Sequence, residues 1–207
     1  WADHKKIIPI DKDKNWFAKK HGLVNKFVIL YSGNQGRCHD FKTIINAAKL
    51  LNKNIFIKFV FIGNGAQNNE IKNLVKKLSL NNFLFLPYQK YENLQYSLNS
   101  ADLALVSLNL KAYNLITPSK LYGHLAASTP IAAICPKSSY LYKIVNENNF
   151  GESFKNGDYI KLKKWIEDLY KNKKKINTYR EHSRKFLLDK YNKNYILDKY
   201  YSIISNS

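Results

Sequence analysis

The sequence predicts an α/β fold in which helices cover both faces of a doubly wound, parallel sheet of about six strands. Short apolar runs of strand length alternate with segments whose apolar residues recur at helical spacing, and several of the runs end at a glycine or a proline. Apolar runs without polar alternation are typical of strands that are buried on both faces. One Rossmann-like domain with a C-terminal helical extension therefore accounts for the 207 residues.

Residues 1–25 are expected to form a connecting segment with one short helix. They mix charged residues with scattered apolar ones, and His21-Gly22 is a typical helix stop before a turn. Residue 1 is Trp and the chain contains no methionine, so the first residue is not an initiator. We therefore expect the sequence to be a piece of a longer protein or a processed chain.

Residues 26–157 are expected to form the core, in which strands and helices alternate. The first strand is followed by Ser32-Gly33, and Asp40 then stands near the N-terminus of a helix. The same order repeats along the core, and the last strand is expected at an edge of the sheet. The expected strands are residues 27–31, 55–62, 83–86, 102–108, 131–134 and 151–154. The expected helices are residues 41–51, 71–78, 94–98, a segment that begins at Pro118, and residues 140–146.

The helix that begins at Pro118 carries candidate ligand-binding residues. Pro118 suits the first helical position, where a missing N–H costs no hydrogen bond, and Thr117 suits the cap before it. Ser119 and Lys120 then stand in the first turn, where free N–H groups and the helix dipole favour a phosphate. The alternative is a capped crossover helix with a structural role alone.

Residues 158–207 are expected to be helical and to pack on the core. Asp158 suits a helix cap, and apolar residues at helical spacing begin at Ile160. The segment is rich in Lys and Tyr. Its lysines fit solvated helix faces, and the alternative is a basic surface close to an anionic membrane.

The formal net charge of +19 suits a partner with negative charge, such as nucleic acid, an anionic membrane or a phosphorylated substrate. However, lysines are spread over nearly the whole chain and Asn is abundant, which indicates a general composition bias as well. The sequence contains neither an aromatic-basic RNA-binding run nor a recognition-helix pattern. We therefore expect no nucleic-acid partner.

The two cysteines and the apolar runs indicate the compartment. Cys38 and Cys135 stand singly, which argues against a structural zinc site and favours reduced, cytoplasmic thiols. No apolar stretch is long enough to cross a bilayer, and no signal-peptide pattern opens the sequence. We expect a cytoplasmic location.

Three loops are expected to meet at the carboxyl ends of the strands, which is where open parallel sheets bind ligands. The first, residues 33–39, has two glycines that allow a close approach of backbone to phosphate, and its Arg37 could form a forked contact. The second is Gly63-Asn64-Gly65, and the third is the helix start at residues 117–120. Glycines and basic groups together predict a phosphorylated ligand, whereas each glycine loop alone also fits a structural turn.

Other enzyme classes lack their motifs in this sequence. Residues 33–36 do not complete a GxGxxG, no acidic residue ends the second strand and no GxxxxGK[ST] occurs, which argues against a dehydrogenase and a P-loop enzyme. The hydrolase motifs GxSxG and HExxH are absent. Cys38 and His39 are adjacent on a loop, which does not make them a catalytic pair, and His124 is expected on a helix face at the margin of the core.

Five segments in chain order form a pattern more specific than any one of them. They are residues 31–36 with His39-Asp40, residues 61–65, 100–106, 118–123 and 126–130, followed by Gly151 and Asp158. Together they resemble the C-terminal, donor-binding domain of retaining, GT-B type bacterial glycosyltransferases, the group 1 or family 4-like enzymes. The resemblance covers nearly the whole chain and is strongest to the variant with a Pro-Ser-Lys sequence, which occurs in enzymes of surface polysaccharide assembly.

The resemblance implies a domain that binds a nucleoside diphosphate sugar, linked to UDP or GDP, for transfer with retention and without a metal bound by the protein or any other cofactor. It also implies that Trp1 to Asp3 ends an interdomain connection, that an N-terminal acceptor domain is missing, and that the last helices reach toward it. The chain alone should then be inactive. By the same analogy the acceptor is a glycan or is anchored to a lipid at the inner face of the cytoplasmic membrane, to which the protein would be peripheral.

The resemblance also assigns roles to individual residues. Lys120 and Arg37 are expected to act in catalysis, because negative charge develops on the departing diphosphate. The expected donor-binding residues are Gly33, Asn34, Gly36, His39, Gly63, Gly65, Tyr88, Thr117, Pro118 and Ser119.

The chain departs from the commoner family pattern at four positions. Asn34 and His39 stand where an Arg and a Lys would hold the diphosphate, and Leu115 and Gly123 stand where two glutamates would be. No carboxylate is therefore available for the ribose.

Two other functions fit the same fold. The first is a non-catalytic nucleotide-binding or interaction module. The second is a nucleotide-sugar epimerase-like domain, which normally needs carboxylate acid–base residues in the cleft. Such carboxylates are scarce at the three loops.

Overall fold

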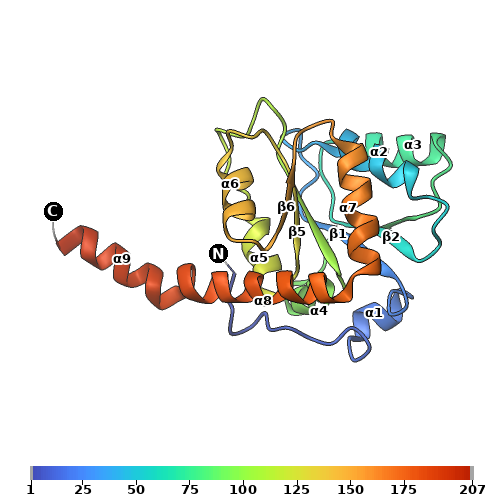
Figure 1. Ribbon diagram of the computed structural model, residues 1–207. Helices are drawn as coiled ribbons and strands as arrows, with labels where there is room; N and C mark the ends of the chain where they lie inside the picture. Colours follow the sequence, from blue (N-terminus) through green and yellow to red (C-terminus); the bar gives the residue numbers. More distant parts are fainter. Residues whose placement is uncertain (1, 206–207) are drawn as a thin grey trace.

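A computed structural model gives the arrangement of residues 2–205, in which one six-stranded sheet has helices on both faces (Figure 1). The strand order is β3-β2-β1-β4-β5-β6, and every neighbouring pair is parallel. The chain moves outward from β1 to β3 and then crosses back to β4, so the order reverses between β1 and β4. The predicted fold class is confirmed.

The strands lie close to their predicted positions. They are β1 (Phe27–Ser32), β2 (Ile57–Ile62), β3 (Phe83–Leu86), β4 (Leu103–Ser107), β5 (Ile131–Ile134) and β6 (Gly151–Phe154). The predicted start of the second strand at Ile55 is wrong by two residues. A turn at Asn54 precedes this strand, because the Asn54 side chain accepts a hydrogen bond from the Phe56 N–H (3.0 Å) and its carbonyl accepts one from Ile57.

Helices follow each of the strands. They are α1 (Trp16–Lys20), α2 (Phe41–Leu50), α3 (Asn68–Lys77), α4 (Leu94–Leu98, preceded by the short helix η1, Tyr91–Asn93), α5 (Lys120–Ala126), α6 (Tyr140–Glu147), α7 (Tyr159–Lys171), α8 (Lys173–Lys190) and α9 (Lys193–Ser205). The short helix expected in residues 1–25 is α1. Asn15 caps its N-terminus, and Gly22 after its end has a φ of 64°, where glycine is favoured.

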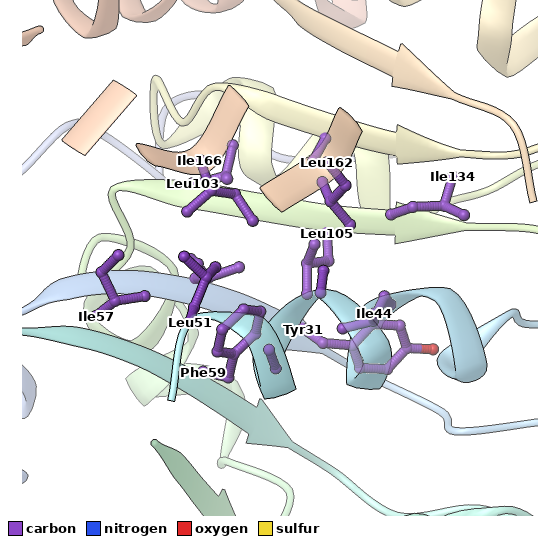
Figure 2. Packing of buried hydrophobic residues seen from close by; sticks show 14 of the residues in the cluster. Tyr31, Ile44, Leu51, Ile57, Phe59, Leu103, Leu105, Ile134, Leu162 and Ile166 are labelled. Carbon is purple, nitrogen blue, oxygen red and sulfur yellow. The ribbon is translucent and has the colours of Figure 1, made fainter. Parts of the chain in front are cut away.

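The alternating sides of each strand pack against different helices. One apolar core lies between the sheet and helices α2, α3 and α7, where Tyr31, Phe59 and Leu105 meet Ile44 and Leu162 (Figure 2). These five side chains are buried completely. Burial of this kind on both faces explains why the strands read as continuous apolar runs.

The second core covers the opposite face of the sheet. Val28, Leu30 and Val106 point to this side and pack against helices α1, α4, α5, α6 and α8. Within α5, Leu121 and Leu125 are buried against the sheet. This packing holds α5 beside the carboxyl ends of β1 and β4.

The start of α5 differs from its prediction. The helix begins at Lys120, and Ser119 takes the cap position without a hydrogen bond from its side chain. The expectation that Thr117 caps and that Pro118 is the first helical residue is therefore wrong by two residues. Pro118 instead begins a tight turn, because its carbonyl accepts a hydrogen bond from the Leu121 N–H (3.0 Å).

The C-terminal helices differ in how they contact the rest of the molecule. Helix α7 packs on the sheet through Leu162 and Ile166, and α8 runs across the α5 side and buries Leu187. Helix α9 has no buried residue and extends away from the sheet (Figure 1). Asp158 occupies the cap position of α7, but its side chain does not cap the helix.

Candidate functional site

The loops that follow β1 and β2 are bonded to each other at the carboxyl edge of the sheet. The Gln35 N–H donates to the Asn64 carbonyl (2.8 Å), and the Gln67 N–H donates to the Gln35 carbonyl (2.9 Å). The Gln67 side chain also donates to the Gly36 carbonyl (2.6 Å), and Asn68 Nδ2 donates to Gln35 Oε1 (2.8 Å). Two of the three predicted ligand loops therefore form a single unit.

Three glycines allow the close contacts at this edge. A Cβ on Gly63 would lie 2.3 Å from the Gly33 carbonyl oxygen, and a Cβ on Gly65 would lie 2.4 Å from Asn34 Oδ1. Gly33 has a φ of 127°, and a Cβ there would lie 2.8 Å from Lys120 Cε. Glycine at position 33 therefore lets the Lys120 side chain lie directly against the backbone after β1.

Lys120 contacts a histidine that is held in one tautomer. Lys120 Nζ lies 3.2 Å from His39 Nε2, and His39 Nδ1 lies 2.6 Å from the Ser107 carbonyl oxygen. Because a carbonyl only accepts, Nδ1 carries the proton and Nε2 presents a lone pair to the ammonium. Burial, with a further contribution from the Lys120 charge, lowers the pKa of His39 to about 4 although the hydrogen bond to Ser107 opposes the shift. The imidazole is therefore neutral near pH 7.

The Lys120 ammonium has no carboxylate partner among residues 2–205, because the ion pairs found there do not include it. Burial lowers its pKa below the usual value for a lysine. Its Nζ lies 5.5 Å from the centre of the Tyr31 ring, which contributes a cation–π contact. A partly desolvated ammonium without a counterion is suited to bind an anion.

A cavity of about 340 Å³ lies in front of Lys120, within the size range of small-molecule sites. Its walls come from the ends of β1 and β2, from the segment after β3, from α4, from α5 and from the N-terminal segment, where Ala2, Asp3 and Ile7 line it. Among the residues that line it are Gly33, Ile62, Tyr88, Gln89, Tyr91, Leu94, Leu98, Ser119, Lys120, Gly123 and His124. The cavity is thus at the carboxyl edge, beside the point where strand order reverses.

A second cavity, of about 350 Å³, adjoins the first one. It is lined by Thr117, Ser119, Tyr122, Tyr191 and Ile196, and Ala2 and Ser119 line both cavities. The two tyrosines come from α5 and from the residue after α8. Its lining is mainly apolar, so the second cavity is less suited than the first to bind an anion.

The predicted site residues take different places in this arrangement. Four of them line the first cavity: Gly33, Tyr88, Ser119 and Lys120. The loop unit contains Asn34, Gly36, Gly63 and Gly65, while His39 supports Lys120, Thr117 lines the second cavity and Pro118 begins the turn before α5.

Arg37 is on the first loop but is not brought to Lys120. Arg37 is exposed and is not among the residues that line either cavity. Its backbone carbonyl accepts a hydrogen bond from Asn109 Nδ2 (2.6 Å), which joins the loop to the segment after β4.

His124 lines the cavity and was missed as a site residue by the sequence reasoning. It is only 1% exposed, and neither ring nitrogen has a hydrogen-bond partner within the described part of the chain. Burial, with a further contribution from the Lys120 charge, lowers its pKa to about 3. The signal in the sequence was its spacing, because a residue four positions after Lys120 lies on the same face of a helix.

Residues 2–205 hold no group of three or more His, Cys, Asp or Glu side chains placed to hold a metal ion. None of the helices in this part of the chain combines the length and the apolar character that a membrane crossing needs.

Comparison with known proteins gives the relationship of this chain. Residues 13–186 match the family described as "Glycosyl transferases group 1". The chain is 27% identical over 169 residues to WbjE, a probable glycosyltransferase of Pseudomonas aeruginosa. The aligned region covers 82% of this chain and 42% of WbjE. It is 34% identical over 102 residues to WcaI of Escherichia coli, a putative colanic acid biosynthesis glycosyl transferase. This aligned region covers 49% of this chain and 25% of WcaI.

The fold is shared with a solved structure of Anabaena HepE in complex with UDP and glucose. The TM-score is 0.83 at 14% identity, and the similarity covers 100% of this chain and 55% of HepE. The chain thus spans less than half the length of the curated relatives WbjE and WcaI. Since the family match extends over residues 13–186, this chain belongs to the glycosyl transferases group 1 family.

Proposed function

We propose that this chain is the donor-binding domain of a retaining glycosyltransferase and that the cavity in front of Lys120 binds a nucleoside diphosphate sugar. The observation that carries the proposal is the partly buried Lys120 ammonium, which faces a cavity at the carboxyl edge of the sheet and has no ion pair with a carboxylate in residues 2–205. An anionic ligand would supply the missing charge. The diphosphate of a nucleotide sugar is such a ligand.

The comparisons support this choice of ligand. HepE, which has the same fold, was solved with UDP and glucose, and WbjE and WcaI are described as glycosyltransferases. We propose UDP or GDP as the nucleotide. The description of WcaI as a protein of colanic acid biosynthesis supports a role in the assembly of surface polysaccharide.

In the proposed reaction, Lys120 stabilises the charge that develops on the departing diphosphate. Positive groups that are already in place contribute most when charge forms in the transition state, and Gly33 and His39 hold the Lys120 side chain in place. Ser119 and Thr117 offer hydroxyl groups at the second cavity, and Ser119 also lines the first. We propose that the reaction needs no metal bound by the protein.

Arg37 is the second cation of the proposal. Because it lies outside the two cavities, it meets the ligand only if the diphosphate extends toward the exposed side of the first loop. We therefore expect Arg37 to contribute less than Lys120 to donor binding.

The remaining parts of the proposal concern the whole protein. Residues 1–25 would connect this domain to an N-terminal acceptor domain, and α8 and α9 would reach toward that domain. The acceptor would be a glycan or a lipid-linked molecule at the cytoplasmic face of the membrane, with the enzyme peripheral to it. The 207-residue chain would bind donor but would not transfer sugar on its own.

Calorimetry of the 207-residue chain with UDP, GDP and their sugar conjugates tests the proposal. We expect Lys120→Ala to weaken binding of the preferred nucleotide by about tenfold or more, because a hydrogen bond to a charged group is lost. Lys76→Ala, at an exposed position on α3, is the matched control and should bind like the unmodified chain. A lack of binding to all of these nucleotides would overturn the proposal.

A further inference from the structure

The floor of the cavity next to Lys120 contains a histidine to which the proposed function gives no role. His124 lines the cavity together with Gly123, and both come from the middle of α5. On the same helix, the charge of Lys120 acts on the imidazole. The Leu98 side chain of α4 packs beside Gly123.

His124 is buried at a cost that the protein does not recover by itself. Both Nδ1 and Nε2 are buried, and neither has a partner among the described residues. A buried polar group without a hydrogen bond costs about 1–3 kcal/mol, so such groups need an explanation. A leucine or phenylalanine at this position would avoid the cost. A ligand that reaches the cavity floor would provide the missing partner.

The chemistry of the imidazole limits what that ligand is. A neutral imidazole has one N–H donor and one acceptor nitrogen, so it pairs with a group that also donates and accepts. A hydroxyl group meets this condition, whereas a phosphate oxygen without a proton only accepts. Lys120 is the better partner for the phosphate, which leaves a hydroxyl as the partner for His124.

The spacing along α5 relates the two contacts. His124 follows Lys120 by four residues, so it lies on the same face and about 6 Å further along the helix axis. Gly123 has no side chain to fill the cavity beside it, and a Cβ there would meet only Leu98, at 3.3 Å. A ligand with phosphate at Lys120 would therefore have room for a sugar ring beside Gly123.

We propose that His124 is a donor-binding residue that forms a hydrogen bond with a sugar hydroxyl of the bound nucleotide, in the first instance a hydroxyl of the ribose. This inference rests on the proposed function, since it needs a nucleotide in the same cavity. It assigns the ribose a neutral partner on α5, whereas the carboxylate that lines the same cavity, Asp3, comes from the N-terminal segment.

The test compares three variants by calorimetry on the 207-residue chain, with the tighter binder of UDP and GDP as probe. His124→Phe and His124→Leu remove both nitrogens, whereas His124→Gln keeps a donor and an acceptor. We expect the first two to bind the nucleotide about tenfold more weakly, which corresponds to one lost hydrogen bond, and the glutamine variant to recover part of the affinity. Binding of inorganic diphosphate, which has no sugar, should be the same in all of them.

Thermal unfolding separates this role from a structural one. Without ligand, His124→Phe and His124→Leu should melt at or above the temperature of the unmodified chain, because unpaired polar atoms are replaced by apolar ones. If one of them packs poorly and melts lower, the other provides the comparison. Equal weakening of nucleotide and diphosphate by both variants would overturn the inference, because the effect would not involve a sugar.

Deoxy forms of the nucleotide identify the hydroxyl. The 2′-deoxy or the 3′-deoxy form of the nucleotide should bind the unmodified chain about tenfold more weakly than the parent nucleotide does. His124→Phe should bind the deoxy form and the parent nucleotide with equal affinity. A loss seen only with the sugar conjugate would assign the hydroxyl to the transferred sugar instead. Unchanged affinity of both apolar variants for nucleotide and conjugate overturns the inference alone, whereas no nucleotide binding by the unmodified chain overturns the proposed function with it.

Discussion

Lys120 Nζ lies 3.2 Å from His39 Nε2, although 81 residues separate the two in the sequence. The Ser107 carbonyl holds the other ring nitrogen of His39 at 2.6 Å, so three segments of the chain meet at this contact. The ammonium is thus placed by a neutral acceptor and not by a carboxylate. A neutral support leaves the positive charge of Lys120 available to an anionic ligand.

The contact predicts that His39 acts through Lys120. We expect His39→Leu to weaken UDP or GDP binding severalfold, because the ammonium loses the acceptor that holds it. In a chain that already carries Lys120→Ala, the same change should have little further effect. Calorimetry on both single variants and the double variant measures this coupling. Independent, additive losses would show that His39 contacts the nucleotide by itself.

The two buried histidines predict how stability depends on pH. Their pKa values fall from 6.5 to about 4 for His39 and to about 3 for His124 on folding. Between these values and 6.5 the unfolded chain binds more protons than the folded chain, so the free energy of unfolding decreases as the pH falls from 6.5 toward 4. Each histidine contributes at most about 1.4 kcal/mol per pH unit.

Urea denaturation at pH 7, 6 and 5 measures this dependence. The variant His124→Leu should lose stability less steeply than the unmodified chain over this range. His182→Leu is the matched control, since the His182 side chain is not buried. Parallel pH profiles for the unmodified chain and His124→Leu would contradict the expectation.

Substitution of Gly63 and of Gly157 by alanine should separate the cost of a steric clash from the cost of backbone strain. Both have a positive φ, of 120° and 88°, but only Gly63 has backbone where a Cβ would lie. We expect Gly157→Ala to cost about 1 kcal/mol from strain and Gly63→Ala to cost clearly more, because the Gly33 backbone must move. Urea denaturation gives both values. Nucleotide affinity should fall for Gly63→Ala alone, and equal costs would contradict the explanation.

Asp102 is the centre of a network of contacts before the first residue of β4, and we expect this network to stabilise the fold strongly. It accepts a hydrogen bond from the Val28 N–H (2.8 Å), forms an ion pair with Lys12 and lies 3.3 Å from Arg180. Because Lys12 is largely buried, Asp102→Ala leaves its charge without a counterion, with the Lys26 carbonyl as its remaining partner, and should cost about 3–5 kcal/mol.

Asp11→Ala is the matched control for this network. Its ion pair with Lys14 is exposed, so its loss should change the free energy of unfolding by less than about 1 kcal/mol. Denaturation of both variants in urea provides the comparison. A small effect of Asp102→Ala would show that the network contributes little.

Much of the fold could be read from the sequence because each element has a local cause. The strands are buried on both faces, so they are continuous apolar runs, and Asp40 and Asn15 cap their helices within their own segments. The start of α5 could not be read in this way. Packing of Leu121 and Leu125 decided it, and the favourable positions of Thr117 and Pro118 for a cap were overridden.

For the candidate site, the sequence alone determined which loops carry glycine and lysine, and hence that an anion site belongs at the carboxyl edge. Only the tertiary structure decided which side chains share a cavity. It placed Lys120 against Gly33 and His39, left Arg37 exposed outside the cavity, and brought the unpaired His124 to its floor. The physical reason is that these contacts join segments after different strands, so they depend on strand order and helix packing, which no local pattern contains.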